Sequence, residues 1–152
     1  MHWLSVVTVL FAALALNGCS ESKNTVDAIG VRMVQFPNGT RIRAEAVATE
    51  ADLQKGLMFR ESLAADAGML FTHPDEGVYP YWMYQTKIPL DIIWMDRDHR
   101  IVEVSLATPP CASKIPKDCP SYGGNMPSRY VLEVSAGTVA KNGLQVGNRL
   151  DY

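Results

Sequence analysis

The sequence of 152 residues contains only three histidines and three cysteines and has no excess of positive charge. Its net charge is −2 and its basic residues are scattered, which disfavours nucleic acid as a partner because no basic stripe could neutralise phosphates. A Gly-x-Ser-x-Gly nucleophile motif and a glycine-rich phosphate loop are both missing. The sequence therefore predicts no catalytic residues, no resident metal and no cofactor.

The first 18 residues differ from the rest and predict an export signal. Leu4 to Leu16 is almost wholly apolar but too short to span a bilayer comfortably. Leu-Asn-Gly-Cys at its end resembles a bacterial lipobox, which predicts that Cys19 carries a lipid. Residues 19–28 would then be a polar linker, and Ser20 favours anchoring at the outer membrane, facing the periplasm. An ordinary signal peptide followed by an unrelated cysteine is the alternative.

Export affects the interpretation of the two remaining cysteines, Cys111 and Cys119. An even pair in an oxidising compartment predicts a disulfide. It would close a short loop and contribute about 2–3 kcal/mol in the chain-entropy model. A metal or redox pair is disfavoured because the spacing is not Cys-x-x-Cys.

Residues 29–152 are expected to form a single, mainly β domain. Two strands, 29–36 and 40–48, flank an Asn-Gly turn. Thr49 then begins a capping box, and a short helix follows as far as about Arg60, with Gly56 inside it. Later strands are expected at 68–71, 92–95, 101–104, 130–134 and 146–152, with a turn at 73–77 and a helical turn at 138–142. Short strands and many turns predict a β-sandwich or jelly-roll-like fold, or a partly closed barrel, with one short α-helix.

Several short motifs, in this order along the chain, resemble one family. They are Gly-Leu-Met-Phe-Arg at 56–60, Gly-Met-Leu-Phe at 68–71, Trp-Met at 82–83 with Thr86, Ile-Pro-Leu-Asp at 88–91, and Leu-Glu-Val at 132–134 followed by Ala-Gly. Together they resemble the bacterial and archaeal family called domain of unknown function 192. The resemblance covers about residues 31–150, implies a compact β domain and implies no agreed activity. The family pattern has Asn where this chain has Gln85.

Four residues are candidates for one ligand-binding pocket. Arg60 could hold a carboxylate or phosphate. Trp82, with Tyr79, Tyr81 and Tyr84, could form a stacking platform for a sugar or planar ligand. Thr86 and Asp91 flank Pro89. The carboxyl of Asp91 lies in apolar surroundings and could therefore act as a general base. Each also has a structural interpretation: Arg60 in a salt bridge with Asp91 or Glu133, Trp82 as a core anchor, and Asp91 as a buried, hydrogen-bonded carboxylate.

Three functions are compatible with these patterns. The first is a non-catalytic accessory module that binds a small molecule or an envelope protein at the membrane surface. The second is an enzyme that uses Asp91 and Arg60 as acid–base and electrostatic groups. The third is a periplasmic copper-handling protein, since thioethers are soft ligands. The methionines it would use are Met33, Met58, Met69, Met83, Met95 and Met126.

Overall fold

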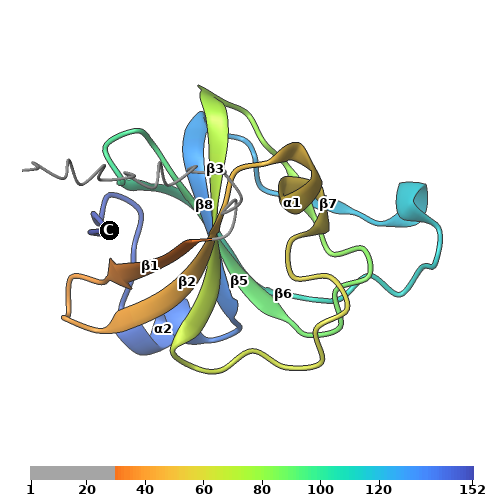
Figure 1. Ribbon diagram of the computed structural model, residues 1–152, viewed down its shortest axis with the longest axis horizontal. Coiled ribbons are helices and arrows are strands. Elements are labelled where there is room, and N and C mark those ends of the chain that lie inside the picture. The colour runs from red at the N-terminus through yellow and green to blue at the C-terminus, as the bar shows by residue number, and fades with distance from the viewer. Residues whose placement is uncertain (1–29) are drawn as a thin grey trace, which may run out of the picture.

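A six-stranded mixed sheet forms the centre of the domain in the computed structural model, which describes residues 30–152 (Figure 1). The predicted signal peptide, linker and lipidated Cys19 lie outside the described residues. The strands are β1 (Gly30–Gln35), β2 (Arg41–Val47), β3 (Ala67–Gly77), β4 (Tyr81–Trp82), β5 (Leu90–Met95), β6 (Ile101–Thr108), β7 (Ser121–Tyr122) and β8 (Ser128–Ser135). The helices are α1 (Glu50–Lys55), the short 3-10 helix η1 (Pro116–Asp118) and α2 (Thr138–Asn142).

The strand order of the large sheet is β1-β2-β3-β8-β5-β6, and β4 pairs with β7 in a separate two-stranded sheet. Only β2 and β3 run parallel, because α1 and the loop after it carry the chain back across the sheet. β8 inserts between β3 and β5 and pairs antiparallel with both. The predicted mainly β, sandwich-like fold is confirmed, and the sheet is not closed into a barrel.

Each face of the sheet has its own hydrophobic cluster. One face packs against α2 and the C-terminal segment and buries residues such as Ile93, Leu132 and Leu150. The opposite face packs against α1 and the segment after β6, and it buries Phe71 and Trp94 among others. Figure 1 shows α2 and the C-terminus towards one end of the domain, and α1 and β7 towards the other. Because side chains alternate along a strand, a shift of one residue decides which cluster a side chain joins.

Helix α1 begins as the capping box predicts but ends earlier. The Thr49 hydroxyl accepts a hydrogen bond from the Asp52 amide at 3.2 Å. The helix stops at Lys55, so the prediction that Gly56 lies inside it is wrong. Gly56 is the C-cap, with φ 46° and ψ −134°, a conformation that suits glycine and ends the helix. The predicted helical turn is α2, and among residues 30–152 no helix is long and apolar enough to cross a membrane.

Two strand predictions need correction. The turn expected at 73–77 belongs to β3, where the ladder with β8 is irregular between Thr72 and Gly77. Pro74 is tolerated there because it lacks only a donor that the irregular ladder does not require. The strand expected at 146–152 is replaced by two isolated bridges, Arg100 with Arg149 and Gln35 with Asp151. The backbone hydrogen bonds of residues 146–152 are divided between two separate edges of the sheet, so no continuous ladder forms.

The predicted disulfide is confirmed: Cys111 and Cys119 are bonded, with a Cα–Cα distance of 5.6 Å. The loop that it closes leads into β7, which pairs with β4 through Tyr81–Tyr122 and Trp82–Ser121. Gly124 follows, where a side chain would lie 2.4 Å from the Pro80 nitrogen. The segment between β6 and β8 therefore supports the aromatic strand β4.

Candidate functional site

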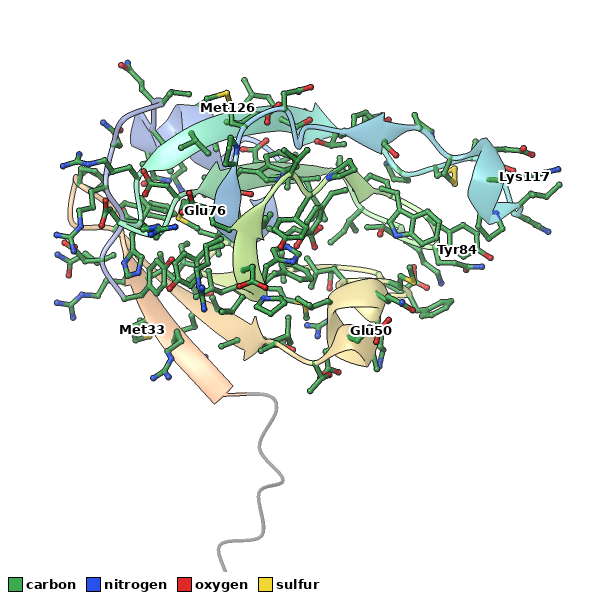
Figure 2. All side chains as sticks on the ribbon, turned by 90° about the horizontal axis from the view of Figure 1, so that it is seen from above. Met33, Glu50, Glu76, Tyr84, Lys117 and Met126 are labelled. Carbon is green, nitrogen blue, oxygen red and sulfur yellow. A yellow bond between two sulfur atoms is a disulfide. The ribbon has the colours of Figure 1, made fainter. Side chains whose placement is uncertain are left out.

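An open groove lies between α1 and the segment that leads into β4. It has a volume of about 450 Å³ and is bordered mainly by Leu53, Gln54, His73, Tyr79, Tyr81 and Trp82, with Glu50 at its rim. In Figure 2, Glu50 and Tyr84 lie in the same half of the domain, away from Met33. Trp82 is 40% exposed, so the structural interpretation of Trp82 as a core anchor is wrong. Hereafter we call this hollow the aromatic groove.

The aromatic groove shares Leu53, Gln54, Tyr81 and Trp82 with a narrow cleft that runs towards the sheet. The cleft has a volume of only about 20 Å³. Its other borders include Gly56, Leu57, Phe71, Thr86 and Glu133. The aromatic groove is concave and mainly apolar, which is the usual form of a small-molecule site.

Glu133 on β8 is the acidic group of the narrow cleft. It is 5% exposed, and none of the hydrogen bonds among residues 30–152 involves its carboxyl, whose oxygens are not fully enclosed and so face the cleft. Its direct neighbours in the sheet are Met69 on β3 and Ile92 on β5, both apolar. Burial raises the pKa of Glu133 from 4.5 to about 8, because the charged form loses its hydration. At neutral pH most of this carboxyl is therefore protonated.

His73, Tyr79 and Tyr81 form a stacked cluster along the wall of the aromatic groove. The His73 ring lies flat on Tyr79, with centroids 3.6 Å apart and an angle of 4°. His73 Nε2 lies 3.1 Å from the Tyr81 hydroxyl. Burial lowers the pKa of His73 to about 4, so the imidazole is neutral and one ring nitrogen can accept a hydrogen bond. Burial, and then the nearby Glu133, raise the pKa of Tyr81 well above 10, which keeps its hydroxyl protonated.

Two of the four residues predicted for one pocket meet in the narrow cleft. Trp82 and Thr86 both border it, beside Glu133. Thr86 is buried, and its hydroxyl lies 3.5 Å from the Tyr84 carbonyl. The bend that carries Thr86 is fixed by the Phe59 amide, which donates to the Gln85 carbonyl at 2.8 Å.

Arg60 lies outside this cleft. Its guanidinium forms a bidentate pair with Glu45 on β2, with distances of 2.5 and 2.7 Å. The expected partners, Asp91 and Glu133, are not the ones it binds. Arg60 borders a separate hollow of about 330 Å³, which the turn at residues 55–58 divides from the narrow cleft. The hydrogen bonds to Glu45 raise the pKa of Arg60, and those same bonds lower the pKa of Glu45.

Asp91 faces the opposite side of the sheet. It is 1% exposed and accepts hydrogen bonds from the Ala107 amide at 2.8 Å and the Val139 amide at 2.9 Å. Helix α2 has no side-chain cap at Gly137, so Asp91 supplies an acceptor for the Val139 amide in its first turn. The predicted convergence of Arg60, Trp82, Thr86 and Asp91 on one pocket is therefore wrong, because strand alternation places Asp91 and Glu133 on different faces.

Sequence reasoning missed Glu133 and His73 as members of a site, whereas Tyr79 and Tyr81 were expected beside Trp82 and do border the aromatic groove. A usable signal existed for Glu133, because a charged residue in the centre of the apolar run Tyr130 to Val134 is rare in a buried strand. His73 carried no such signal, since it stood in a segment that was expected to be a turn. Among residues 30–152 there is no group of three or more His, Cys, Asp or Glu side chains placed to hold a metal ion.

Comparison with known proteins gives a family and two similar crystal structures. Residues 33–152 match the model of domain of unknown function 192, described as an uncharacterized ACR. A protein of unknown function from Novosphingobium aromaticivorans is 30% identical, with a TM-score of 0.70 over 82% of this chain and 85% of that one. A protein from Sinorhizobium meliloti, described as a candidate transcription regulator, is 28% identical, with a TM-score of 0.72 over 82% of this chain and 95% of that one. No curated protein matches the chain. The chain belongs to the family of domain of unknown function 192.

Proposed function

We propose that this protein is a binding module that holds a small organic molecule with a ring or another apolar body in the aromatic groove, without transforming it. The observation that carries the proposal is the exposed Trp82 beside a cleft whose buried carboxyl, Glu133, has no hydrogen-bond partner among residues 30–152. The fully enclosed polar side-chain atoms without a partner among the described residues are Ser128 Oγ and Tyr152 OH, so the Glu133 oxygens keep contact with the cleft, where water or a ligand can reach them. A ligand that reaches this carboxyl supplies the missing partner.

The groove is supported so that its walls stay in place. Tyr81 packs edge-on against Phe71 and Trp94, with centroids 5.2 and 5.8 Å apart. Pairing with β7 holds β4, and the Cys111–Cys119 disulfide closes the loop before β7. A site that is already formed loses less side-chain and loop entropy when a ligand binds.

The geometry disfavours the enzyme that was considered as an alternative. Asp91 is buried on one face of the sheet with two backbone partners, and Arg60 is paired with Glu45 on the other face. A general base and an electrostatic group must contact the same reacting atoms. Asp91 and Arg60 cannot do this without rearrangement of the sheet.

The copper-handling alternative also lacks support from the arrangement of the methionines. Met69, Met83 and Met95 are buried in the hydrophobic clusters, where they pack as ordinary core residues. Met33 and Met126 are both exposed but lie well apart in Figure 2. Met58 and Met69 both border the hollow beside Arg60, but Met69 is buried, so the described residues present no group of several surface thioethers suited to copper(I).

We further propose that the module is exported and is held at the outer membrane, facing the periplasm, by a lipid on Cys19. Support comes from the apolar segment that ends in Leu-Asn-Gly-Cys and from a bonded pair of cysteines in the domain. The partners would then be the membrane and a small molecule or an envelope protein. The description of the Sinorhizobium protein as a regulator suggests DNA, but a net charge of −2 without a basic stripe disfavours that partner.

Binding can be tested by isothermal titration of the mature protein with a panel of aryl probes, such as 2-phenylethanol and 2-phenylethylamine. We expect at least one probe to bind and to lose most of its affinity in Trp82→Ala. Arg60→Lys is the matched control and should bind normally, because Arg60 lies in the neighbouring hollow. Failure of all aryl probes to bind, or equal binding by the Trp82 variant, would contradict the proposal.

Anchoring can be tested by mass spectrometry of the membrane fraction. A diacylated or triacylated N-terminus on Cys19 is the expected result, and Cys19→Ser should release the protein from the membrane. A Cys19→Ser protein that stays in the membrane fraction would show that the lipid is not the anchor.

A further inference from the structure

We propose that the group recognised at the end of the narrow cleft is a primary ammonium, which would make the ligand an amine with an aryl or alkyl body. The proposal rests on the proposed function, since the body of the ligand occupies the aromatic groove. Its basis is the carboxyl of Glu133, which is 5% exposed, borders the cleft and has no hydrogen-bond partner among residues 30–152.

The size of the cleft restricts the group that can enter. A volume of about 20 Å³ is close to the space that one water-sized group requires, which is roughly 10–15 Å³. A primary ammonium is a single heavy atom with three donors. A guanidinium or a trimethylammonium group is several times larger and would stay in the wider aromatic groove. The cleft therefore selects for a compact head group.

The surroundings of Glu133 favour a donor from outside the chain. Met69 and Ile92 flank it in the sheet, and neither side chain can donate a hydrogen bond. Gln54, Tyr81 and Thr86 also border the cleft and carry donors, but none of them forms a hydrogen bond with Glu133 in the part of the chain that the structure describes. A hydrogen-bonded charge pair out of water is stronger than one at the surface.

Several charged or titratable groups lie on the elements around Glu133. Lys55 on α1 borders the cleft but forms no ion pair with Glu133 among the described residues, and it acts on Glu45 instead. Tyr81 on β4 and His73 on β3 are uncharged at neutral pH. Arg60, which follows α1, and Glu45 on β2 neutralise each other. None of these groups therefore supplies the positive charge that an ionised Glu133 would need.

Binding of an ammonium would release a proton. The carboxyl of Glu133 is mostly protonated at neutral pH, and it becomes a carboxylate when it pairs with the cation. The released proton goes to the buffer, and the ammonium keeps all three of its own. Amine affinity should therefore rise with pH until the pH exceeds about 8, the pKa of Glu133 in the free protein.

The experiment is isothermal titration of the mature protein with 2-phenylethylamine and its neutral counterpart 2-phenylethanol. We expect the amine to bind at least about tenfold more tightly than the alcohol, a ratio that corresponds to roughly 1.4 kcal/mol. Its affinity should rise between about pH 6 and about pH 8, by at most about tenfold per unit. Titration in two buffers of different ionisation enthalpy should show net proton release for the amine and none for the alcohol.

Single substitutions show which residue causes the preference for the amine and its pH dependence. Glu133→Gln should abolish the preference for the amine over 2-phenylethanol, together with the pH dependence and the proton release. Glu61→Gln makes the same substitution at an exposed position outside the groove and should change neither the amine preference nor its pH dependence. Circular dichroism establishes that each variant is folded. If Glu133→Gln does not fold, the amine preference and the proton release of the unaltered protein still decide the question.

The outcomes separate the two proposals. Equal affinity for amine and alcohol without proton release would overturn the ammonium assignment and leave ligand binding in the groove intact. Absence of binding by either probe would overturn both. A third probe, the amide of N-acetyl-lysine, carries the same ammonium on an alkyl chain. Tighter binding of this probe than of 2-phenylethylamine would assign the site to lysine side chains, and weaker binding would assign it to free aryl amines.

Discussion

Gly56 lies across the narrow cleft from the carboxyl of Glu133. A side-chain carbon built at Gly56 would lie 3.7 Å from Glu133 Oε2 and 3.2 Å from Phe71 Cζ. The same glycine ends α1 with φ 46°. The residue that terminates the helix therefore also leaves open the space beside the buried carboxyl.

Gly56→Ala should lower both stability and ligand affinity. The added methyl group would be strained at this φ, at a cost of about 1–3 kcal/mol of unfolding free energy, and it would narrow the cleft. Urea unfolding and titration with 2-phenylethylamine measure the two effects. Gly39→Ala is the control, because Gly39 also has a positive φ, 87°, but a side chain there meets nothing within 4 Å. Normal amine affinity in Gly56→Ala would contradict the placement of the ligand beside Gly56.

Asp91→Asn should destabilise the domain and leave ligand binding unchanged in the folded fraction. An amide side chain can accept only one of the two backbone hydrogen bonds, from Ala107 or Val139, and it turns its NH2 group towards the other amide. Leaving a buried donor unsatisfied costs about 1–3 kcal/mol, which urea unfolding can resolve. Loss of binding at full stability would instead assign Asp91 to a site.

The Arg60–Glu45 pair should contribute little to stability. Both side chains are about one-third exposed, at 36% and 32%, and such pairs are worth roughly 0.2–1 kcal/mol. A double-mutant cycle with Arg60→Gln and Glu45→Gln, followed by urea unfolding, gives the coupling energy directly. Coupling well above this range would mean that the bidentate geometry is held more rigidly than its exposure suggests.

The pH dependence of stability should show two opposing contributions. The pKa of Glu133 is raised from 4.5 to about 8 in the folded protein, so its contribution to stability is lost as pH rises through that interval. The pKa of His73 is lowered from 6.5 to about 4, so its contribution is lost as pH falls from 6.5 towards 4. The two effects on stability oppose each other between pH 4.5 and pH 6.5. Between pH 6.5 and about pH 8, only Glu133 of the two changes the stability.

Thermal or urea unfolding across this pH range checks the prediction. The slope above pH 6.5 should be negative and no steeper than about 1.4 kcal/mol per pH unit for a single group. Glu133→Gln should remove this slope, and between pH 4.5 and 6.5 it should leave the increase in stability with pH that His73 causes without opposition. A Glu133→Gln protein that keeps the full alkaline decrease would show that another group causes it.

Local patterns in the sequence determined much of the fold. Period-two alternation and the Asn-Gly turn predicted the β1–β2 hairpin, and the capping box predicted the start of α1. The disulfide followed from two cysteines in a chain predicted to be exported, and the two are bonded. These features depend on residues close together in the chain or on composition, so the sequence contains the information that specifies them.

Only the tertiary structure decided which side chains meet. β8 enters the sheet between β3 and β5, and this pairing of strands far apart in the chain brings Glu133 beneath α1 and β4. Asp91 and Glu133 belong to neighbouring strands, yet the register pairs Glu133 with Ile92 and turns Asp91 to the other face. Strand order and register depend on how two hydrophobic clusters pack around the whole sheet. A period of two within one strand cannot show which face becomes the floor of a groove.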